Sequence, residues 1–465
     1  MSTTRRTVQK SIGFGILLLL ILIVAINARD ETLSPEAQAF GAASEPGVAD
    51  RENAFFAVLG FASPLDQNPH TQGMQAAARF EAALAQRPYF VDDSLPDLTA
   101  PEMLSTATAI GDLICGREED GCRQQRRQKT DHLAAALNTH KAMLARYERL
   151  QTYPHYRDAL TSTIAAPSAP FKVLSSAHQL LLAKVVLSAR GGDLDQALAT
   201  LEQDTRFLRM VLRDADSLIA KAIAARLLTN NASLLSELVS QNKVKVAASL
   251  ETAQAIVLPL SEKERDLGPA LRREFRVARH MFTGFAKDPD FRRSAMNVSN
   301  EGALASRGRD ILYRLFYRPN ATVNSAYRHF AGLAAVMELP AREFIKHLPA
   351  HGTAAAPGAS LIRWSLIYNP LGKFMLASDP PDYRRSTAQL NNLDGLLRLV
   401  ALQLKAKQEG IVAGQMADFL HNAGDAFANP YTGAPMQYDA GEHHLYFLGA
   451  DVNLLPVKRV EVWLG

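Results

Sequence analysis

The sequence has few of the residues on which covalent cross-links and metal sites depend. Its 465 residues include two cysteines and two tryptophans, and aromatic residues make up 7% of the chain. Charge of one sign is not in excess either, because 51 Lys and Arg residues are balanced by 47 Asp and Glu residues. A net charge of +4 spread along the chain does not suggest nucleic acid as a partner, and we expect none.

The common catalytic and ligand-binding motifs are absent from the sequence. It contains no G-x-S-x-G, H-E-x-x-H, Walker A, G-x-G-x-x-G or EF-hand pattern. One cluster combines histidines with acids, since His443 and His444 follow Asp439 and Glu442. Neighbouring residues of a strand point to opposite faces, so these two histidines cannot bind one ion together without distortion. We therefore predict no cofactor and no metal, and no catalytic residue is identified.

Long apolar runs are also rare, and one of them reaches the length of a membrane span. Residues 11–28, SIGFGILLLLILIVAINA, contain no charge, and as a helix they would extend about 27 Å, close to the hydrocarbon thickness of a bilayer. Arg5, Arg6 and Lys10 precede the run, whereas Arg29 is followed at once by two acids. Because positive charge is retained in the cytoplasm, this asymmetry predicts a cytoplasmic N-terminus.

The alternative for this run is a signal peptide that is removed by cleavage. Cleavage after Ala28 would place Ile26 where a small residue is preferred, and no A-x-A pattern is present there. We therefore predict an uncleaved signal anchor at residues 11–28, with residues 1–10 in the cytoplasm and the body in the periplasm. The predicted location is the bacterial inner membrane, which the chain would cross once.

The two cysteines lie close together, as Cys115 and Cys122 in C-G-R-E-E-D-G-C. In an oxidising periplasm such a pair indicates a structural disulfide, worth about 2.5 kcal/mol for a loop of this size. A metal site is the alternative, but two thiols without a nearby histidine or third cysteine bind metal poorly. A redox pair would normally be C-x-x-C, and six residues separate these two.

Beyond the anchor, the sequence divides into three segments. Residues 29–50 are small and acidic with Pro and Gly, which predicts a linker. Residues 51–410 show the periodicity of amphipathic helices and predict a helical periplasmic domain. Residues 411–465 change character and predict a C-terminal segment with a small β-hairpin. The predicted fold class is mainly α, with a body that is either irregular or solenoid-like.

The clearest architectural pattern is a helical hairpin. Residues 177–189 and 194–212 carry Leu and Ala at helical spacing, and G-G-D at residues 191–193 separates them. Glycine permits the turn and aspartate caps the following helix. The hairpin resembles one unit of a tetratricopeptide-type array, but no clean second copy follows at a 34-residue period.

Two other regions matter for the later description. The apolar spacing over residues 129–150 predicts one amphipathic helix, with His140 as a hydrogen-bonded core or boundary residue. Residues 261–330 are rich in arginine with interleaved acids. They predict a solvated helix face with a flexible loop, or alternatively a basic groove for an anionic lipid or glycan.

The C-terminal segment begins with N-P-Y-T-G-A-P at residues 429–435. Two short runs around a D-A-G-E turn at residues 439–442 predict the β-hairpin, and residues 457–464 alternate as a last strand would. The N-P-Y-T-G-A-P motif resembles a D-P-F-T-G-x-P pattern found near the C-terminus of many exported Gram-negative proteins. Together with N-A-F-F-A-V-L-G-F at residues 53–61, it is similar to uncharacterised membrane-anchored proteobacterial envelope proteins, a resemblance that implies no activity.

Two functions of different classes follow from these observations. The first is a protein-interaction or scaffold component of the cell envelope, with an envelope protein as its partner and no enzymatic activity. The second is an envelope hydrolase or transferase whose site is assembled from scattered residues. A long groove lined with exposed apolar residues would favour the first, and a deep pocket with paired carboxylates would favour the second.

Overall fold

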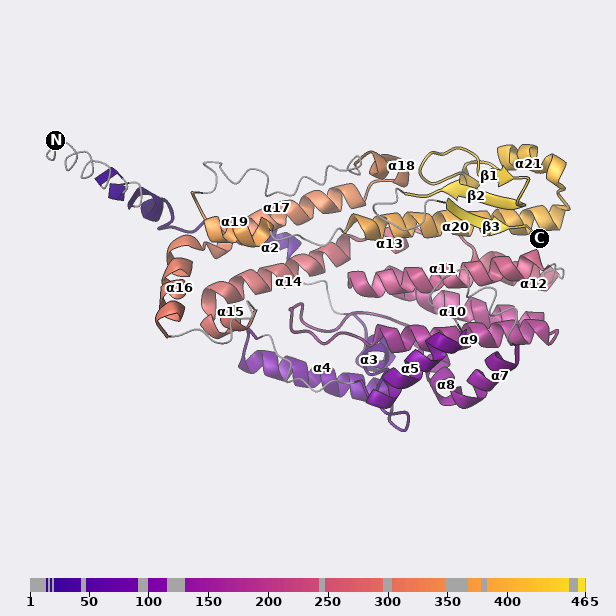
Figure 1. Cartoon of the computed structure of the whole chain (residues 1–465), viewed down its shortest axis with the longest axis horizontal. Helices are drawn as coiled ribbons and strands as arrows, with labels where there is room; N and C mark the ends of the chain where they lie inside the picture. The colour runs from indigo at the N-terminus through magenta and orange to yellow at the C-terminus, as the bar shows by residue number, and fades with distance from the viewer. Residues whose placement is uncertain are drawn as a thin grey trace, which may run out of the picture.

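Helices form most of the described chain, which confirms the predicted mainly α fold class (Figure 1). The computed structural model describes residues 14, 15, 17, 18, 21–42, 47–90, 99–114, 130–241, 247–295, 303–347, 367–377, 383–450 and 459–464. Cys115 and Cys122, the predicted disulfide, lie outside these residues. Within the described part of the chain, we find no helix that is both long enough and apolar enough to cross a membrane.

The helices run in both directions along the long axis of the molecule. In the first half of the chain they are α2 (Pro35–Phe40), η1 (Asp50–Glu52), α3 (Ala54–Leu59), α4 (Pro69–Gln86), α5 (Pro101–Ile114), α7 (Thr130–Thr139), α8 (Lys141–Leu150), α9 (Phe171–Arg190), α10 (Leu194–Asp214) and α11 (Leu218–Ser240).

The second half adds further helices and one sheet. These are α12 (Ala247–Ile256), α13 (Glu262–Arg265), α14 (Gly268–Lys287), α15 (Pro289–Ala295), α16 (Ala303–Phe316), α17 (Pro319–Met337), α18 (Ala341–Phe344), η2 (Ile345–His347), α19 (Pro370–Ala377), α20 (Arg384–Glu409), η5 (Ala413–Gln415), α21 (Met416–Asn422), η6 (Asp425–Phe427), β1 (Gln437–Asp439), β2 (His444–Leu448) and β3 (Arg459–Trp463).

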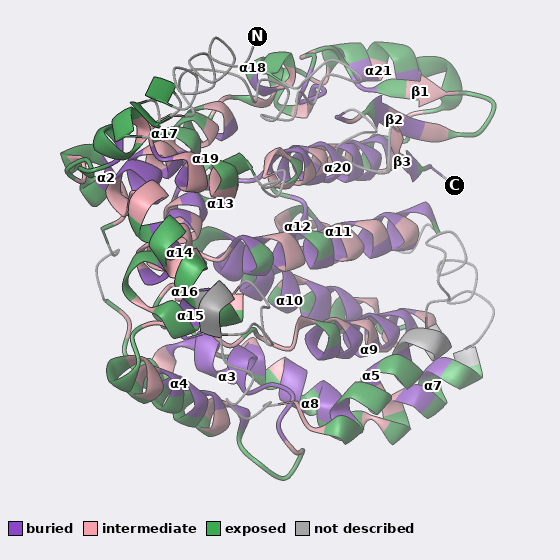
Figure 2. Ribbon diagram, turned by 60° about the vertical axis from the view of Figure 1, so that its left-hand side comes forward, coloured by how far each residue is buried: buried purple, intermediate pink, exposed green. Residues whose placement is uncertain are grey.

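Helices α9, α10, α11 and α20 form the centre of the body, where Figure 2 shows most residues buried. The predicted hairpin is confirmed, because α9 ends at a turn in which Gly192 has φ of 90° and Asp193 caps α10 through the N–H of Gln196. Only glycine adopts this φ without strain. The solenoid arrangement of the whole body stays a prediction.

The centre also contains a buried polar network around Asp204 of α10. Its carboxylate accepts hydrogen bonds from the Tyr147 hydroxyl at 2.9 Å, the Gln151 amide at 3.0 Å and the Asn231 amide at 2.7 Å. His178 lies 3.3 Å from the same carboxylate. Tyr147 and Gln151 belong to α8 and its C-terminal end, His178 to α9 and Asn231 to α11, so the network links the packing of these three helices to α10. It supports the fold rather than a site open to solvent.

Helices α7 and α8 replace the single helix predicted over residues 129–150. The chain leaves helical geometry at His140, where φ is −109° and ψ is 24°. Neither proline nor glycine marks this break in the sequence. The bend allows α7 and α8 both to contact α9, and burial lowers the pKa of the His140 imidazole.

The residues predicted as a linker are in part docked on the body. Ser34 caps α2, and the Phe40 ring packs edge-on against Phe275 of α14 at 5.5 Å. The Asp30 carboxylate accepts the N–H groups of Asn320 and Ala321, which begin α17. A helix N-terminus attracts a carboxylate in this way. Residues 30–42 therefore belong to the folded body.

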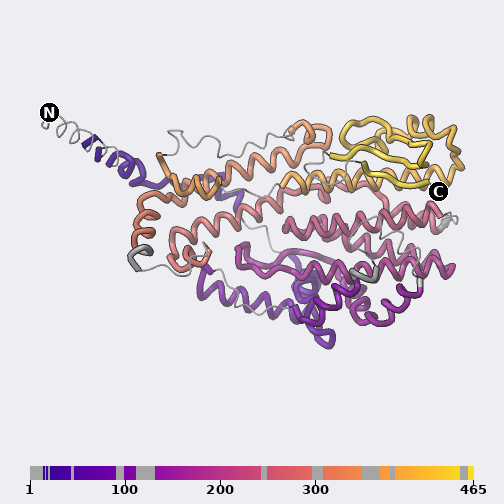
Figure 3. Tube along the Cα trace, viewed as in Figure 1, coloured from indigo at the N-terminus to yellow at the C-terminus, as the bar shows by residue number. Residues whose placement is uncertain are grey.

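Residues 21–29 lead away from the body near α16 and α19 (indigo in Figure 3). Asn27 is fully buried, its amide donates to the carbonyl of Ile367 at 2.6 Å, and its side-chain oxygen accepts the N–H of Asn369 at 2.8 Å. The described residues of the apolar run before it are largely exposed, with Phe14 at 64% and Ile21 at 56% of their full surface.

The C-terminal segment forms a three-stranded antiparallel sheet in the order β1-β2-β3, confirming the predicted hairpin and last strand. Leu445 and Phe447 of β2 are buried against α20. A Cβ atom on Gly395 would lie 2.3 Å from the Phe447 ring, so α20 needs glycine there. The N-P-Y-T-G motif makes a turn in which the Asn429 side chain accepts the N–H of Tyr431, so its role here is structural.

Candidate ligand site in a basic cavity

A cavity of about 750 Å³ lies beside α14. Its walls also include the loop at residues 157–162, Asp216 between α10 and α11, and residues near α2 and η1. Because these segments are distant from one another in the sequence, no local sequence motif predicts this cavity. We call it the basic cavity; the charged side chains that line it are Asp50, Arg157, Asp158, Asp216, Arg273, Arg276, Arg279 and Lys287.

Part of the arginine-rich region is ion-paired in the wall of this cavity. Arg273 lies 3.1 Å and Arg276 lies 2.9 Å from the two carboxylate oxygens of Asp216. All three side chains are at least four-fifths buried. The predicted solvated helix face is therefore wrong for this stretch of α14, since the arginines meet an acid supplied by the link between α10 and α11.

Asp158 forms a second carboxylate next to Asp216. One of its oxygens accepts the N–H groups of Asp216 at 2.8 Å and Ser217 at 3.1 Å, at the start of α11. Burial and the neighbouring Asp216 charge raise the pKa of Asp158 to about 7, although Arg273 opposes the shift. Two carboxylates this close do not both ionise readily, so Asp158 gains or loses a proton near neutral pH.

Three cations of the basic cavity remain without an acidic partner. Within the described residues, no carboxylate lies within ion-pair distance of Arg157, Arg279 or Lys287. Arg157 and Arg279 are half-buried and Lys287 is exposed. Their positive charge is available to a ligand, whereas that of Arg273 and Arg276 is shared with Asp216.

A histidine and a tyrosine complete the wall. The Tyr89 and His280 rings have centroids 5.0 Å apart, and the His280 Nε2 donates to the carbonyl of Pro88 at 2.7 Å. Burial lowers the pKa of His280. The imidazole is therefore neutral near pH 7, and its Nδ1, which has no partner among the described atoms, is left as an acceptor.

The residues singled out in the sequence lie elsewhere. Asp439 accepts the N–H groups of Gly441 and Glu442 in the hairpin turn, and it pairs with Arg459 at 3.2 Å. His443 lies in the same turn, next to His444 of β2. No group of three potential metal ligands occurs in the part of the chain that the structure describes.

Comparison of the chain with models of known protein families, with curated proteins and with solved structures finds no match. The resemblance to membrane-anchored proteobacterial envelope proteins therefore stays a prediction. The basic cavity has to be interpreted from its own chemistry.

Proposed function

We propose that the protein is an inner-membrane-anchored envelope protein whose helical body binds a small anionic compound in the basic cavity. The observation that carries the proposal is the convergence of Arg157, Arg279 and Lys287, without acidic partners among the described residues, on that cavity. Guanidinium and ammonium groups are strong donors to phosphate and carboxylate oxygens. The volume of about 750 Å³ suits a small molecule.

The membrane anchor at residues 11–28 remains part of this proposal. Its support is the exposure of large apolar side chains in the described portion of the run, and the basic residues that precede it. Exposed apolar surface of this kind is unfavourable in water and favourable in a bilayer. The body would then lie in the periplasm, where a small anionic solute can reach the cavity.

An envelope hydrolase or transferase that acts on the same anion is the second candidate. It is favoured by the adjacent carboxylates of Asp158 and Asp216 in the cavity wall. A carboxyl group with a pKa of about 7 can give or take a proton at neutral pH, which is what acid–base catalysis requires. Paired carboxylates in a cavity favour an enzyme over a scaffold protein.

A protein-binding role has its own support in an apolar groove of about 550 Å³ between α12 and α20. Val257, Leu258, Ala401 and Phe427 line it, and Leu258 is 55% exposed. An envelope protein could place an apolar side chain there. This groove is smaller than the basic cavity and carries fewer charged groups, so we rank the partner role below the ligand role.

The test is isothermal titration calorimetry of the full-length protein in detergent micelles with inorganic phosphate, glycerol 3-phosphate and citrate. We expect saturable binding of at least one of these anions, weakened about tenfold in Arg279→Ala, because one charge-assisted hydrogen bond is worth roughly that factor. Arg206→Ala is the matched control, since Arg206 is 70% exposed on α10, outside the cavity. Failure of all three anions to bind, or equal affinity in Arg279→Ala, would refute the proposal.

A further inference from the structure

A second cavity, of about 680 Å³, lies among α13, α20 and the segment that follows α17. We call it the acidic cavity; the charged side chains that line it are Glu262, Arg265, Asp266, Glu338, Arg342, Asp394, Arg398 and Asp425. None of these residues lines the basic cavity. The polar and charged side chains that line it suggest a different ligand.

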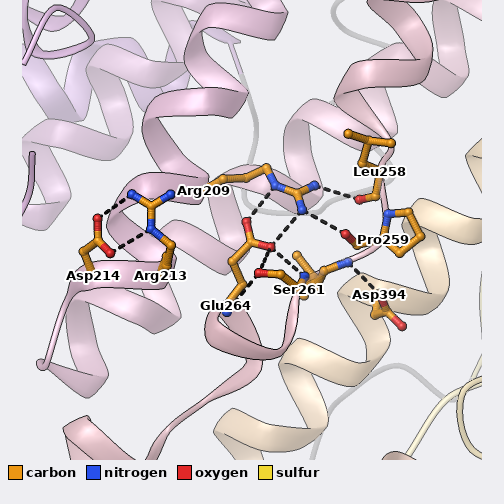
Figure 4. A network of polar contacts seen from close by, with 9 residues as sticks. Arg209, Arg213, Asp214, Leu258, Pro259, Ser261, Glu264 and Asp394 are labelled. Carbon is orange, nitrogen blue, oxygen red and sulfur yellow. Dashed lines mark hydrogen bonds and ion pairs between the residues drawn. The ribbon is translucent and has the colours of Figure 1, made fainter. Parts of the chain in front are cut away.

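One wall of the acidic cavity is held in place by a buried ion pair (Figure 4). Arg209 of α10 donates to both carboxylate oxygens of Glu264, at 2.7 and 2.8 Å, and to the carbonyl groups of Leu258 and Pro259. Glu264 in turn accepts the N–H and hydroxyl of Ser261. These bonds fix α13, which carries Glu262 and Arg265 into the cavity, so this wall is already formed without a ligand.

The floor of the acidic cavity is a polar stripe on α20. Thr387, Asn391, Asp394 and Arg398 are separated by four, three and four residues, which places them on one face of the helix. Asp394 is satisfied, because it accepts the N–H of Leu260 at 3.0 Å and pairs with Arg398 at 2.6 Å.

The other two floor residues are not satisfied. The Thr387 hydroxyl and the Asn391 side-chain nitrogen have no hydrogen-bond partner in the described structure, although the residues are only 4% and 7% exposed. Buried polar groups in native proteins almost always have a partner. Because both residues line the cavity, the oxygen atoms of a ligand could form hydrogen bonds with the Thr387 hydroxyl and the Asn391 amide.

The rim carries more negative than positive charge. Glu262, Asp266, Glu338 and Asp425 are exposed at the cavity and form no ion pair with a described residue. Of the cations, Arg265 and Arg398 both lie near Asp394, at 3.8 and 2.6 Å, and Arg342 is exposed without an ion pair to a described residue, so four unpaired carboxylates lie beside one unpaired guanidinium. The spare charge is therefore negative.

The spacing of these acids argues for an organic cation rather than a metal ion. No three acidic or histidine side chains of the described residues come together closely enough to hold a metal. A metal ion needs several oxygen ligands within about 2.6 Å. An amine at the rim can instead interact with several carboxylates at longer range.

We propose that the acidic cavity binds a small organic amine that also carries hydroxyl groups, such as an amino sugar. The ammonium group would lie among the rim carboxylates, and the hydroxyl groups would hydrogen-bond to Thr387 and Asn391. This site is independent of the basic cavity and of the anion proposed there.

The proposal is tested by calorimetric titration of the full-length protein in detergent with glucosamine, and with N-acetylglucosamine, which is similar but uncharged. We expect glucosamine to bind at least tenfold more tightly than its acetylated form. Asn391→Leu should abolish this binding, and Asp425→Asn should weaken it several-fold. Asp418→Asn, an exposed acid on α21 outside the cavity, should leave it unchanged.

A second readout separates binding from folding. Because Asn391 has an unpartnered polar atom, Asn391→Leu should melt at an equal or higher temperature than the parent protein in the absence of glucosamine. Absence of glucosamine binding, equal binding of the two sugars, or unchanged binding in Asn391→Leu would each overturn the proposal. A lower melting temperature of Asn391→Leu would also overturn it, since the side chain would then be needed by the fold.

Discussion

The basic and acidic cavities are of similar size, about 750 and 680 Å³, but they use their polar groups differently. In the basic cavity the most buried charges are paired with one another, as Asp216 is with Arg273 and Arg276, and cations remain at the surface. In the acidic cavity the floor contains polar atoms without partners among the described residues, and carboxylates remain at the rim. Buried charges that pair with each other stabilise the fold, whereas unpaired polar and charged groups are available to bind a ligand.

This comparison predicts its largest effect for Asp216. Asp216→Ala should lower the free energy of unfolding by about 3 kcal/mol, because it leaves two buried guanidinium groups without their counter-ion. Denaturant unfolding measures the change. The control is Asp290→Ala, which removes an exposed pair with Arg293 and should cost less than about 1 kcal/mol. Equal losses in the two variants would mean that the wall of the basic cavity is not stabilised by its ion pairs.

Charge reversal should distinguish the two cavities from each other. Lys287→Glu should weaken citrate binding by about tenfold or more, since it replaces an attractive charge with a repulsive one. The same variant should bind glucosamine as the parent protein does, because Lys287 does not line the acidic cavity. Parallel titrations with the two compounds measure this, and a loss of both affinities would indicate a general structural effect.

The pH dependence should differ between the parent protein and Asp158→Asn. Burial and Asp216 raise the pKa of Asp158 from 3.8 to about 7, so the folded protein holds this proton more tightly than the unfolded chain does. The raised pKa therefore favours the folded state at low pH, and stability from this group falls as the pH rises from about 4 to about 7.

Asparagine does not titrate, so Asp158→Asn should show a flatter melting temperature across that pH window. Anion binding should respond as well, because ionisation of Asp158 adds negative charge to the basic cavity. We expect anion affinity to decrease above pH 7 in the parent protein and not in Asp158→Asn. Superimposable pH profiles of the two proteins would show that Asp158 does not titrate there.

The smallest expected effect concerns Thr387. Thr387→Val keeps the shape of the side chain and removes a hydroxyl that has no partner among the described residues, so stability should be unchanged or higher by up to about 1 kcal/mol. A matched comparison is Tyr147→Phe, which removes a hydroxyl that is hydrogen-bonded to Asp204 and should cost about 1 kcal/mol. Losses of the same size would show that the Thr387 hydroxyl is already satisfied without a ligand.

Local patterns predicted several elements of the fold. The α9–α10 hairpin follows from apolar spacing around G-G-D, and the β1–β2 hairpin follows from two short runs around D-A-G-E. In each case neighbouring residues contain the necessary information, because spacing, glycine and a capping aspartate act within one or two turns of chain. The break at His140 carries no such signal, which is why one helix was predicted there.

The sites had no equivalent local pattern. Asp158, Asp216 and Arg273 are at least 57 residues apart in sequence, yet one hydrogen bond joins Asp158 to Asp216 and one ion pair joins Asp216 to Arg273. The sequence offered only the arginine-rich stretch as a signal, and both a solvated face and a basic groove were consistent with it. The ion pairs with Asp216 show that the predicted solvated helix face is wrong for Arg273 and Arg276. The predicted basic groove stays a proposal, which is supported by Arg279.

The amino-acid sequence by itself determined the mainly helical class, the position of the main hairpins and the apolar run at residues 11–28, because these depend on periodicity and length. Only the tertiary structure decided which charged groups pair and which remain free. That outcome depends on distances between segments far apart in the chain, such as Asp216 and α14, or Asp394 and the loop that precedes α13. The proposed ligand sites consist of the charged and polar groups that stay unpaired. They can therefore be identified only from the packed arrangement of the helices.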